Sequence, residues 1–280
     1  MNWRTRSFGG ALSSRSRRGT PGGCSKEAEL KPHLIRYWLT PAADEPPEER
    51  DERIGDVCAT YREAPGRVAA GERVISTDEM TGVQALERAA PGLPPRPGKV
   101  ERREFEYIRH GTLSLIINFD VVTGEVICPS IGPTRNEADF SAHIRSTVES
   151  DPSTRQWHVV LDNLNTHCSE SLVRYVAEIS RTSADLGIKE RCGVLKSMAT
   201  RAAFLTDPSH KVVFHYTPKH ASWLNQVEQW LSILVRKLLR RGNFTSTDDL
   251  RNKVLAFIAY FNRTMAKPFK WTYQGKPLRV

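Results

Sequence analysis

The sequence predicts an α/β fold in which helices flank a mixed β-sheet, and three observations support this class. The apolar run Trp157–Leu161 has the length and composition of a buried strand and ends directly at Asp162. Segments of strand, hairpin, helix, strand and helix character follow one another along the chain. The chain has 280 residues, of which 39% are hydrophobic, enough for one large domain and a small appendage.

The first 70 residues are predicted to lie outside the main domain. Residues 1–24 are rich in Arg, Ser and Gly and show no amphipathic period, so we expect a disordered basic tail. Residues 25–40 are compatible with a short helix. The acidic, Pro-containing run 42–53 is typical of a linker, and Ile54–Glu63 is expected to form a second helix.

The main domain is predicted to begin near Gly71. Its first strand is expected at Val74–Thr77, and a Pro-rich excursion follows at residues 91–97. A β-hairpin comes next, with strands Thr112–Val121 and Glu125–Ser130 joined by a Thr-Gly turn.

The second half of this domain is predicted to place helices around two strands. Asn136–Val148 is expected to be a helix with Asn136 as its N-cap. After the strand that ends at Asp162, the expected elements are a helix Ser169–Ile179, an inserted helical hairpin within residues 182–209, a strand Lys211–Tyr216, a helix Trp223–Arg241, and a helix Leu250–Phe261 preceded by a possible cap at Ser246.

Three segments carry a carboxylate that could belong to a common site. Asp162 lies at the carboxyl edge of its strand, where open sheets place their chemistry, and Asp78 follows the first predicted strand. Glu228 falls inside the apolar arc of its predicted helix. Burying an unpaired carboxylate costs several kcal/mol, so Glu228 needs a partner, and a metal ion is the obvious one. For Asp162 a local turn-forming role, next to Asn163, stays open.

The same segments resemble the three signature blocks of DDE transposases, in the bacterial insertion-sequence branch of the mariner superfamily. The blocks are Ser76–Met80, Leu161–His167 and Tyr216–Glu228, in the family's order, and the resemblance extends from about Glu27 to the C-terminus. It implies an RNase H-like (DDE integrase/transposase) catalytic core in residues 71–280. It also assigns Asp78, Asp162 and Glu228 as the catalytic, metal-binding triad.

The implied reaction is metal-dependent DNA cleavage followed by strand transfer. Two Mg²⁺ or Mn²⁺ ions about 4 Å apart can activate the attacking oxygen and stabilise the leaving one, if carboxylates on rigid supports hold them. Asp78 is expected to bridge both ions, and Asp162 and Glu228 are each expected to complete the coordination shell of one ion. In the family, water cuts the end of the element and the released 3′-hydroxyl attacks the target DNA. Glu79 should point to the opposite face of its strand and play a supporting part.

Other polar residues in the blocks have two open interpretations each. His167 could contact a phosphate or orient water, or it could make a structural hydrogen bond. Asn225 could orient a carboxylate or bind DNA, and a local turn or cap role is an equal alternative. Trp223 is expected to be a core or interface residue rather than a base-stacking platform.

The net charge of +9 and the pI near 9.5 suit a polyanionic partner. A solvated charged surface would have the same composition, so composition alone does not establish DNA binding. The resemblance implies the element ends and target DNA as partners and a homodimer assembled on DNA. The candidate DNA-binding residues are Arg102, Arg103, Arg109, Lys219, His220, Arg236, Lys237, Arg240 and Arg241.

The cysteines and the apolar runs argue against other classes of protein. The five cysteines are odd in number and form no close CxxC pair, which disfavours a disulfide scaffold or a zinc knuckle and fits a reducing cytosol. No apolar run reaches about 18 residues, and the N-terminus lacks a signal-peptide core, so no membrane association is expected. We expect a cytoplasmic, nucleoid-associated bacterial protein.

Two features depart from the family pattern. Asp162 and Glu228 are 66 residues apart, roughly twice the family's usual interval, and we attribute the excess to the insertion at 182–209. The family normally carries paired helix-turn-helix modules upstream, and only Ser25–His33 resembles the end of such a head, which predicts an N-terminally truncated copy. Two alternatives therefore stay open: a hydrolytic RNase H-like nuclease, and a catalytically crippled DNA-binding remnant.

Overall fold

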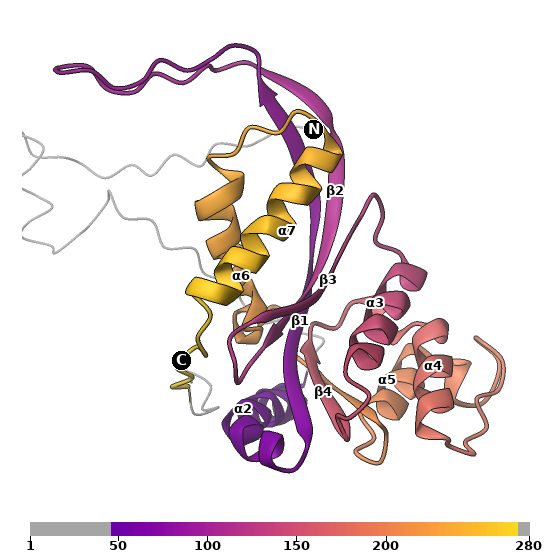
Figure 1. Ribbon diagram of the computed structural model, residues 1–280. Helices are drawn as coiled ribbons and strands as arrows, with labels where there is room; N and C mark the ends of the chain where they lie inside the picture. Colours follow the sequence, from indigo (N-terminus) through magenta and orange to yellow (C-terminus); the bar gives the residue numbers. More distant parts are fainter. Residues whose placement is uncertain (1–45, 274–280) are drawn as a thin grey trace, which may run out of the picture. The chain divides into compact units, whose positions relative to one another are not determined.

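A five-stranded mixed sheet forms the centre of the computed structural model, which describes residues 46–273 (Figure 1). The strand order is β3-β2-β1-β4-β5. β1 (Glu72–Arg88) pairs antiparallel with β2 (Tyr107–Asp120), which pairs antiparallel with β3 (Val126–Gly132). β4 (Gln156–Leu161) is parallel to β1 and to β5 (Val212–Tyr216). This topology confirms the predicted RNase H-like fold. The predictions for residues 1–45 lie outside the described residues.

Helices cover both faces of the sheet. One face carries α3 (Glu137–Ser150), α4 (Glu170–Ser180) and α5 (Met198–Leu205), and the other carries α6 (Val227–Leu234), the π-helical turn η4 (Val235–Leu239) and α7 (Thr247–Thr264). α2 (Pro47–Ala69) packs against β1 and β5. Three short 3₁₀ turns complete the described elements: η1 (Asn165–Cys168), η2 (Val194–Lys196) and η3 (Ser222–Leu224).

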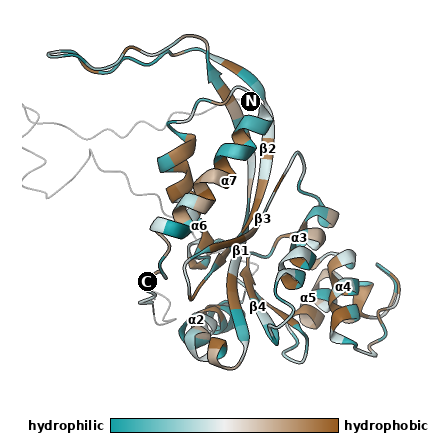
Figure 2. Cartoon of the chain, viewed as in Figure 1, coloured by the Kyte–Doolittle hydropathy of each residue, from teal (hydrophilic) through white to brown (hydrophobic). Residues whose placement is uncertain are grey.

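The two-residue period of the strands divides the apolar side chains between these layers. Leu115 and Ile117 of β2 pack with α6 and α7, whereas Ile116 packs with α3 and α4. In β4, Val159 and Leu161 lie in the α3–α5 layer and Val160 lies against α2. Figure 2 shows the resulting pattern, with hydrophobic colour concentrated in the central strands and both colours on the helices. The central strands are therefore buried on both faces.

Local capping signals were predicted well. Asn136 caps α3, where its side chain accepts from the backbone N–H of Asp139 at 3.0 Å and the Asp139 carboxylate bonds back. Ser169 caps α4 in the same way, although the sequence placed it inside the helix. Ser246 caps α7 through the N–H of Asp249 at 3.0 Å. These caps satisfy N–H groups that a helix start leaves unpaired.

The predicted boundaries of β1 and α2 were wrong, the first because strand pairing extends β1 and the second because a local helix start lies inside the predicted linker. The first strand does not end at Thr77 but continues to Arg88, since β2 pairs with it from Ile75 to Arg88. Figure 1 shows this ribbon leading into a long two-stranded arm, residues 89–106, held by bridges such as Leu93 to Arg102. Helix α2 begins at Pro47, within the predicted linker, because Pro at the first turn and two following glutamates favour a helix start.

The predicted helical hairpin in the insertion is also wrong. Only α5 is an α-helix there, and residues 183–193 form a loop bridged between Ile188 and Cys192. Gly187 and Gly193 both have positive φ, and a Cβ at Gly187 would lie 2.1 Å from the Cys192 carbonyl oxygen. The loop therefore requires glycine at both positions.

Among residues 46–273, no helix combines the length and the apolar character needed to cross a membrane.

Candidate active site

Two adjacent acidic residues of β1 point to opposite faces of the sheet. Ser76 and Asp78 face α6, and the Ser76 hydroxyl accepts a hydrogen bond from the backbone N–H of Val227 at 2.8 Å. Glu79 faces the α3 side, where the Arg135 guanidinium lies 2.8 Å from its carboxylate. The alternation predicted from the sequence therefore separates Asp78 from Glu79, although Asp78 lies within β1 and not at its end.

The parallel pairing of β1 and β4 brings Asp162 next to Asp78. Ser76 is the register partner of Val160, so two residues further along Asp78 is level with Asp162. β4 ends at Leu161, whereas β1 continues. The carboxyl end of β4 thus leaves an opening beside Asp78, which Asp162 borders.

A buried amide fixes the start of α6 on β1. The Asn225 side chain donates to the Thr77 carbonyl oxygen at 2.9 Å and lies 3.4 Å from Asp78 Oδ2. Its oxygen accepts a hydrogen bond from the Ser76 hydroxyl. Because Asn225 is held in an extended conformation, α6 starts two residues later and not at Trp223 as the sequence suggested. Glu228, half-buried, lies in the first turn of α6.

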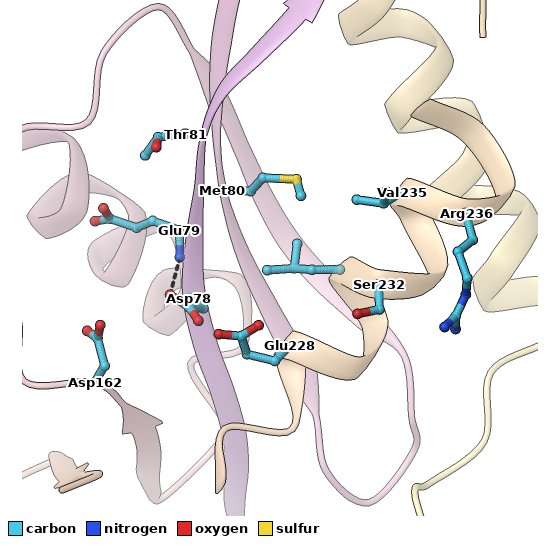
Figure 3. Close-up of a pocket in the computed structure, with 10 residues that line it drawn as sticks. Asp78, Glu79, Met80, Thr81, Asp162, Glu228, Ser232, Val235 and Arg236 are labelled. Carbon is cyan, nitrogen blue, oxygen red and sulfur yellow. Dashed lines mark hydrogen bonds between the residues drawn. The ribbon is translucent and has the colours of Figure 1, made fainter. Parts of the chain in front are cut away.

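The three acidic residues line one cavity of about 460 Å³. Figure 3 shows Asp78 between Asp162 and Glu228, and we call these three the carboxylate pocket. The remaining lining residues are Glu79, Met80, Thr81, Leu231, Ser232, Val235 and Arg236. In the part of the chain that the structure describes, no group of three or more His, Cys, Asp or Glu side chains is drawn together closely enough to hold a metal ion as it stands.

Negative charge in the carboxylate pocket is only partly balanced. Burial, followed by the nearby charges of Asp162 and Glu228, raises the pKa of Asp78 to about 7, although the N–H of Glu79 donates to its Oδ1 at 2.7 Å. Within residues 46–273, no basic side chain forms an ion pair with Asp78 or Glu228. Carboxylate oxygens are the ligands that Mg²⁺ prefers, so this donor set fits a divalent cation.

Asp162, in contrast, has a cationic partner. His167 Nδ1 lies 2.8 Å from Asp162 Oδ1, and His167 Nε2 lies 3.6 Å from Glu79 Oε1. Burial alone would lower the pKa of His167, but these two carboxylates raise it to about 9. His167 and Arg135 together keep the pKa of Glu79 below its ordinary value despite its burial.

The comparison with known families agrees with this arrangement. The sequence profile of the DDE superfamily endonuclease family matches residues 73–251, which is well over half of the chain and includes all three acidic residues. The chain belongs to the DDE superfamily endonuclease family. No curated protein matched this DDE endonuclease.

Solved structures similar to the DDE endonuclease include three of Mos1. The Mos1 mariner paired-end complex with Mn is 13% identical, with a TM-score of 0.49 over 91% of this chain and 75% of that chain. The Mos1 strand transfer complex is 14% identical, with a TM-score of 0.47 over 84% and 64% of the two chains. The catalytic domain of Mos1 mariner transposase is 14% identical, with a TM-score of 0.44 over 79% and 85%.

The nine basic residues predicted to contact DNA are all exposed, but they do not form one cluster at the pocket. Only Arg236 lines the cavity of the DDE endonuclease, and Lys237 follows it on the π-helical turn η4. Arg102 and Arg103 lie on the arm, where Arg103 pairs with Glu101 at 3.0 Å. The others are Arg109 on β2, Lys219 and His220 between β5 and η3, and Arg240 and Arg241 after η4.

Sequence reasoning missed two residues that build the site of the DDE endonuclease. Ser76, a buried polar residue directly after Val74-Ile75, anchors the start of α6. Its place inside an apolar strand was the available signal. Arg135 precedes α3 and reaches Glu79, 56 residues away, and nothing local in the sequence indicates that contact.

Proposed function

We propose that this DDE endonuclease is a transposase of the bacterial insertion-sequence branch of the mariner superfamily, which cleaves DNA and transfers the cut strand. The observation that carries the proposal is that Asp78, Asp162 and Glu228 come from three separate elements and line one cavity. Membership of the DDE superfamily endonuclease family supports the same reaction class. The proposal takes residues 71–280 as the catalytic domain, with α2 packed against it.

The residues of the carboxylate pocket would hold the metal ions. Asp78 lies centrally and is the candidate for the ligand shared by both ions, with Asp162 and Glu228 on either side. When bound, two Mg²⁺ or Mn²⁺ ions supply activation of the attacking oxygen and stabilisation of the leaving oxygen. The contribution of the chain is rigid support: Asn225 and Ser76 fix the helix of Glu228 on the strand of Asp78.

DNA is the proposed substrate and partner, both at the element ends and at the target, with two copies of the chain assembling on it. Arg236 at the cavity and Lys237 beside it place positive charge next to the carboxylates, where a phosphodiester backbone would run. The basic residues of the arm and of the β5–η3 turn would extend this contact along DNA. Backbone contacts of this kind position a duplex without selecting its sequence.

A hydrolytic nuclease is the second candidate, because three carboxylates suffice for cleavage by water. A strand-transfer assay with a pre-cut 3′-hydroxyl end and a supercoiled target separates the two functions. Joined product supports the transposase, whereas cleavage without joining supports the nuclease.

The first test is Asp162→Asn, which removes a negative ligand without changing the shape of the side chain. We expect Mg²⁺- or Mn²⁺-dependent cleavage to fall by about 1000-fold, the equivalent of several kcal/mol of transition-state stabilisation. Binding to a DNA duplex should stay close to that of the wild type. Asp207→Asn, a surface acid whose hydrogen bonds are to its own loop, is the matched control and should cut normally. Cleavage at the wild-type rate by Asp162→Asn would leave Asp162 as a turn residue only.

A further inference from the structure

His167 is a fully buried histidine held between two carboxylates of the site. Its ring nitrogen Nδ1 faces Asp162, at 2.8 Å from Oδ1 and 3.0 Å from the backbone carbonyl oxygen of the same residue. These distances require an N–H at Nδ1 that donates to Asp162. Within residues 46–273, the hydrogen bonds and ion pairs of the Asp162 carboxylate, including one from the Leu164 N–H at 3.4 Å, are all to Oδ1. The other oxygen, Oδ2, is left for a ligand.

The backbone of His167 is held by two hydrogen bonds, and its ring packs against an aromatic side chain. The 3₁₀ turn η1 begins three residues after Asp162, and the His167 N–H donates to the Leu164 carbonyl oxygen at 3.0 Å. The Tyr216 hydroxyl, at the end of β5, donates to the His167 carbonyl oxygen at 3.0 Å. The Phe140 ring packs 4.3 Å from the imidazole. An imidazole held in this way presents its Nδ1–H to Asp162 in one orientation.

The second nitrogen of His167 connects the ring to the opposite face of β1. Nε2 lies 3.6 Å from Glu79 Oε1, within ion-pair distance, and both atoms are buried without a hydrogen-bond partner in the described part of the chain. Glu79 is itself 1% exposed at its side chain and paired with Arg135. The buried imidazole between Asp162 and Glu79 is thus part of a row of charged groups that runs from the exposed Arg135 to the edge of the carboxylate pocket.

We infer that His167 is a positioning residue: it holds Asp162 Oδ1 through its Nδ1–H so that Oδ2 is presented toward Asp78 before a metal ion binds. This inference rests on the proposed function, in which Asp162 is a metal ligand. A carboxylate that is free to rotate must be ordered on binding, which weakens metal affinity. Loss of a hydrogen bond that orients a metal ligand lowers affinity by about 10- to 100-fold in known metal sites.

Two substitutions at His167 separate positioning from packing. Asparagine has an amide N–H close to the place of Nδ1, so His167→Asn keeps a donor for Asp162 and loses the contact toward Glu79. His167→Leu fills similar space without any donor. Mn²⁺ binding to each purified variant is measured by calorimetry without DNA, and the metal concentration for half-maximal cleavage is measured in parallel.

The positioning role predicts that His167→Leu binds Mn²⁺ about 10- to 100-fold more weakly and regains cleavage at high Mn²⁺, whereas His167→Asn stays near the wild type. A purely structural role predicts the same loss of thermal stability in both variants and unchanged Mn²⁺ affinity. His158→Leu is the control, because it removes a buried histidine near the amino end of β4, away from Asp162, and should lower stability without changing Mn²⁺ affinity.

A measurement on the wild-type chain covers the case in which His167→Leu does not fold. The Nδ1–H of His167 is followed by ¹H–¹⁵N NMR during titration with Mg²⁺, and its signal should shift with the midpoint of binding. An unchanged signal, or equal Mn²⁺ affinity in both variants, would overturn the inference. If wild-type protein neither binds Mn²⁺ nor cuts DNA, the proposed function fails instead, so the two outcomes are distinguishable.

Discussion

β1 and β4 carry two buried polar clusters, one near their amino ends and one where β4 ends, and the two clusters are balanced differently. The first, which we call the basal cluster, consists of Asp56, Arg67, Glu72, His158 and His215. The second is the carboxylate pocket. Both bring together side chains from β1 and β4 with a helix on one side, so the difference between them lies in charge and not in architecture.

Every charge of the basal cluster meets an opposite charge or a hydrogen-bond partner. Arg67 donates to His158 Nε2 at 2.8 Å and to Glu72 at 3.1 Å. His158 Nδ1–H can then donate to His215 Nε2 at 3.0 Å, and His215 Nδ1–H to Asp56 at 2.7 Å. In the carboxylate pocket, Asp162 has His167, whereas Asp78 and Glu228 pair with no described basic residue.

The comparison teaches how a structural cluster differs from a site that awaits a ligand. A network in which each charged group has a partner of opposite charge or a hydrogen-bond partner stabilises the fold and needs no added ligand. Adjacent carboxylates that share no cation destabilise the unliganded fold, and they persist where an added positive charge relieves the repulsion. A substitution that removes a charged or hydrogen-bonding group should therefore lower the free energy of unfolding in the basal cluster and raise it in the carboxylate pocket.

The largest expected effect on stability is at the basal cluster. His158→Leu leaves His215 without its donor and removes one of the acceptors of Arg67, and a buried polar group left without a partner costs about 1–3 kcal/mol. We expect the free energy of unfolding to fall by about 2–4 kcal/mol in urea titrations. Arg155→Ala removes an exposed partner of the same Glu72 and should cost under about 1 kcal/mol. Equal effects of the two variants would contradict a cooperative network.

In the carboxylate pocket, a substitution that removes a charge should increase the free energy of unfolding instead of lowering it. In EDTA, Asp78→Asn removes a buried charge facing two others, so we expect it to raise the free energy of unfolding by about 1–2 kcal/mol, or several degrees in Tm. Mn²⁺ at about 100 times its Kd should stabilise the wild type by about 2.7 kcal/mol and the variant by less. Thermal melts with and without Mn²⁺ measure both effects. A variant that is less stable than the wild type in EDTA would show that Asp78 supports the fold.

The contrast also explains which features of the site could be predicted from the sequence. Asp162 and Glu228 were recognisable because each departs from a local pattern, one at the end of an apolar strand and one inside an apolar helix arc. The N-caps Asn136 and Ser246 were likewise predictable, because each depends only on residues within the next helical turn. A signal confined to a few neighbouring residues can be read without knowing the fold.

Features set by distant partners could not be predicted. The extension of β1 to Arg88 depends on pairing with β2, and the break before α6 depends on Asn225 reaching Thr77, 148 residues away. The contact of His167 with Glu79 likewise joins η1 to the opposite face of β1. His167 was identified as part of a motif, but the sequence left open which groups its ring contacts. The sequence does not give the orientation of a side chain in a turn.

The basal cluster should also make stability depend on pH. Burial, followed by the charge of Arg67, lowers the pKa of His158 to about 4, whereas an unfolded histidine titrates near about 6.5. His158 is therefore neutral in the fold, and its stabilising contribution is present above pH 6.5 and lost as pH falls toward 4. The stability difference between wild type and His158→Leu should narrow across this window in urea titrations. A constant difference would show that His158 keeps the same proton in both states.

The smallest expected effect concerns the rim of the carboxylate pocket, where Arg236 brings positive charge close to the acids. If Arg236 contacts a backbone phosphate, Arg236→Ala should lower affinity about equally for all duplexes and reduce the slope of log K against log salt by about 1. Arg174→Ala, on α4 at the other face of the sheet, removes the same charge and should leave the slope unchanged. Fluorescence anisotropy at several salt concentrations gives both slopes. An unchanged slope for Arg236→Ala together with slower cleavage would instead place Arg236 at the scissile phosphate, because a contact made only during the reaction changes the rate and not the binding.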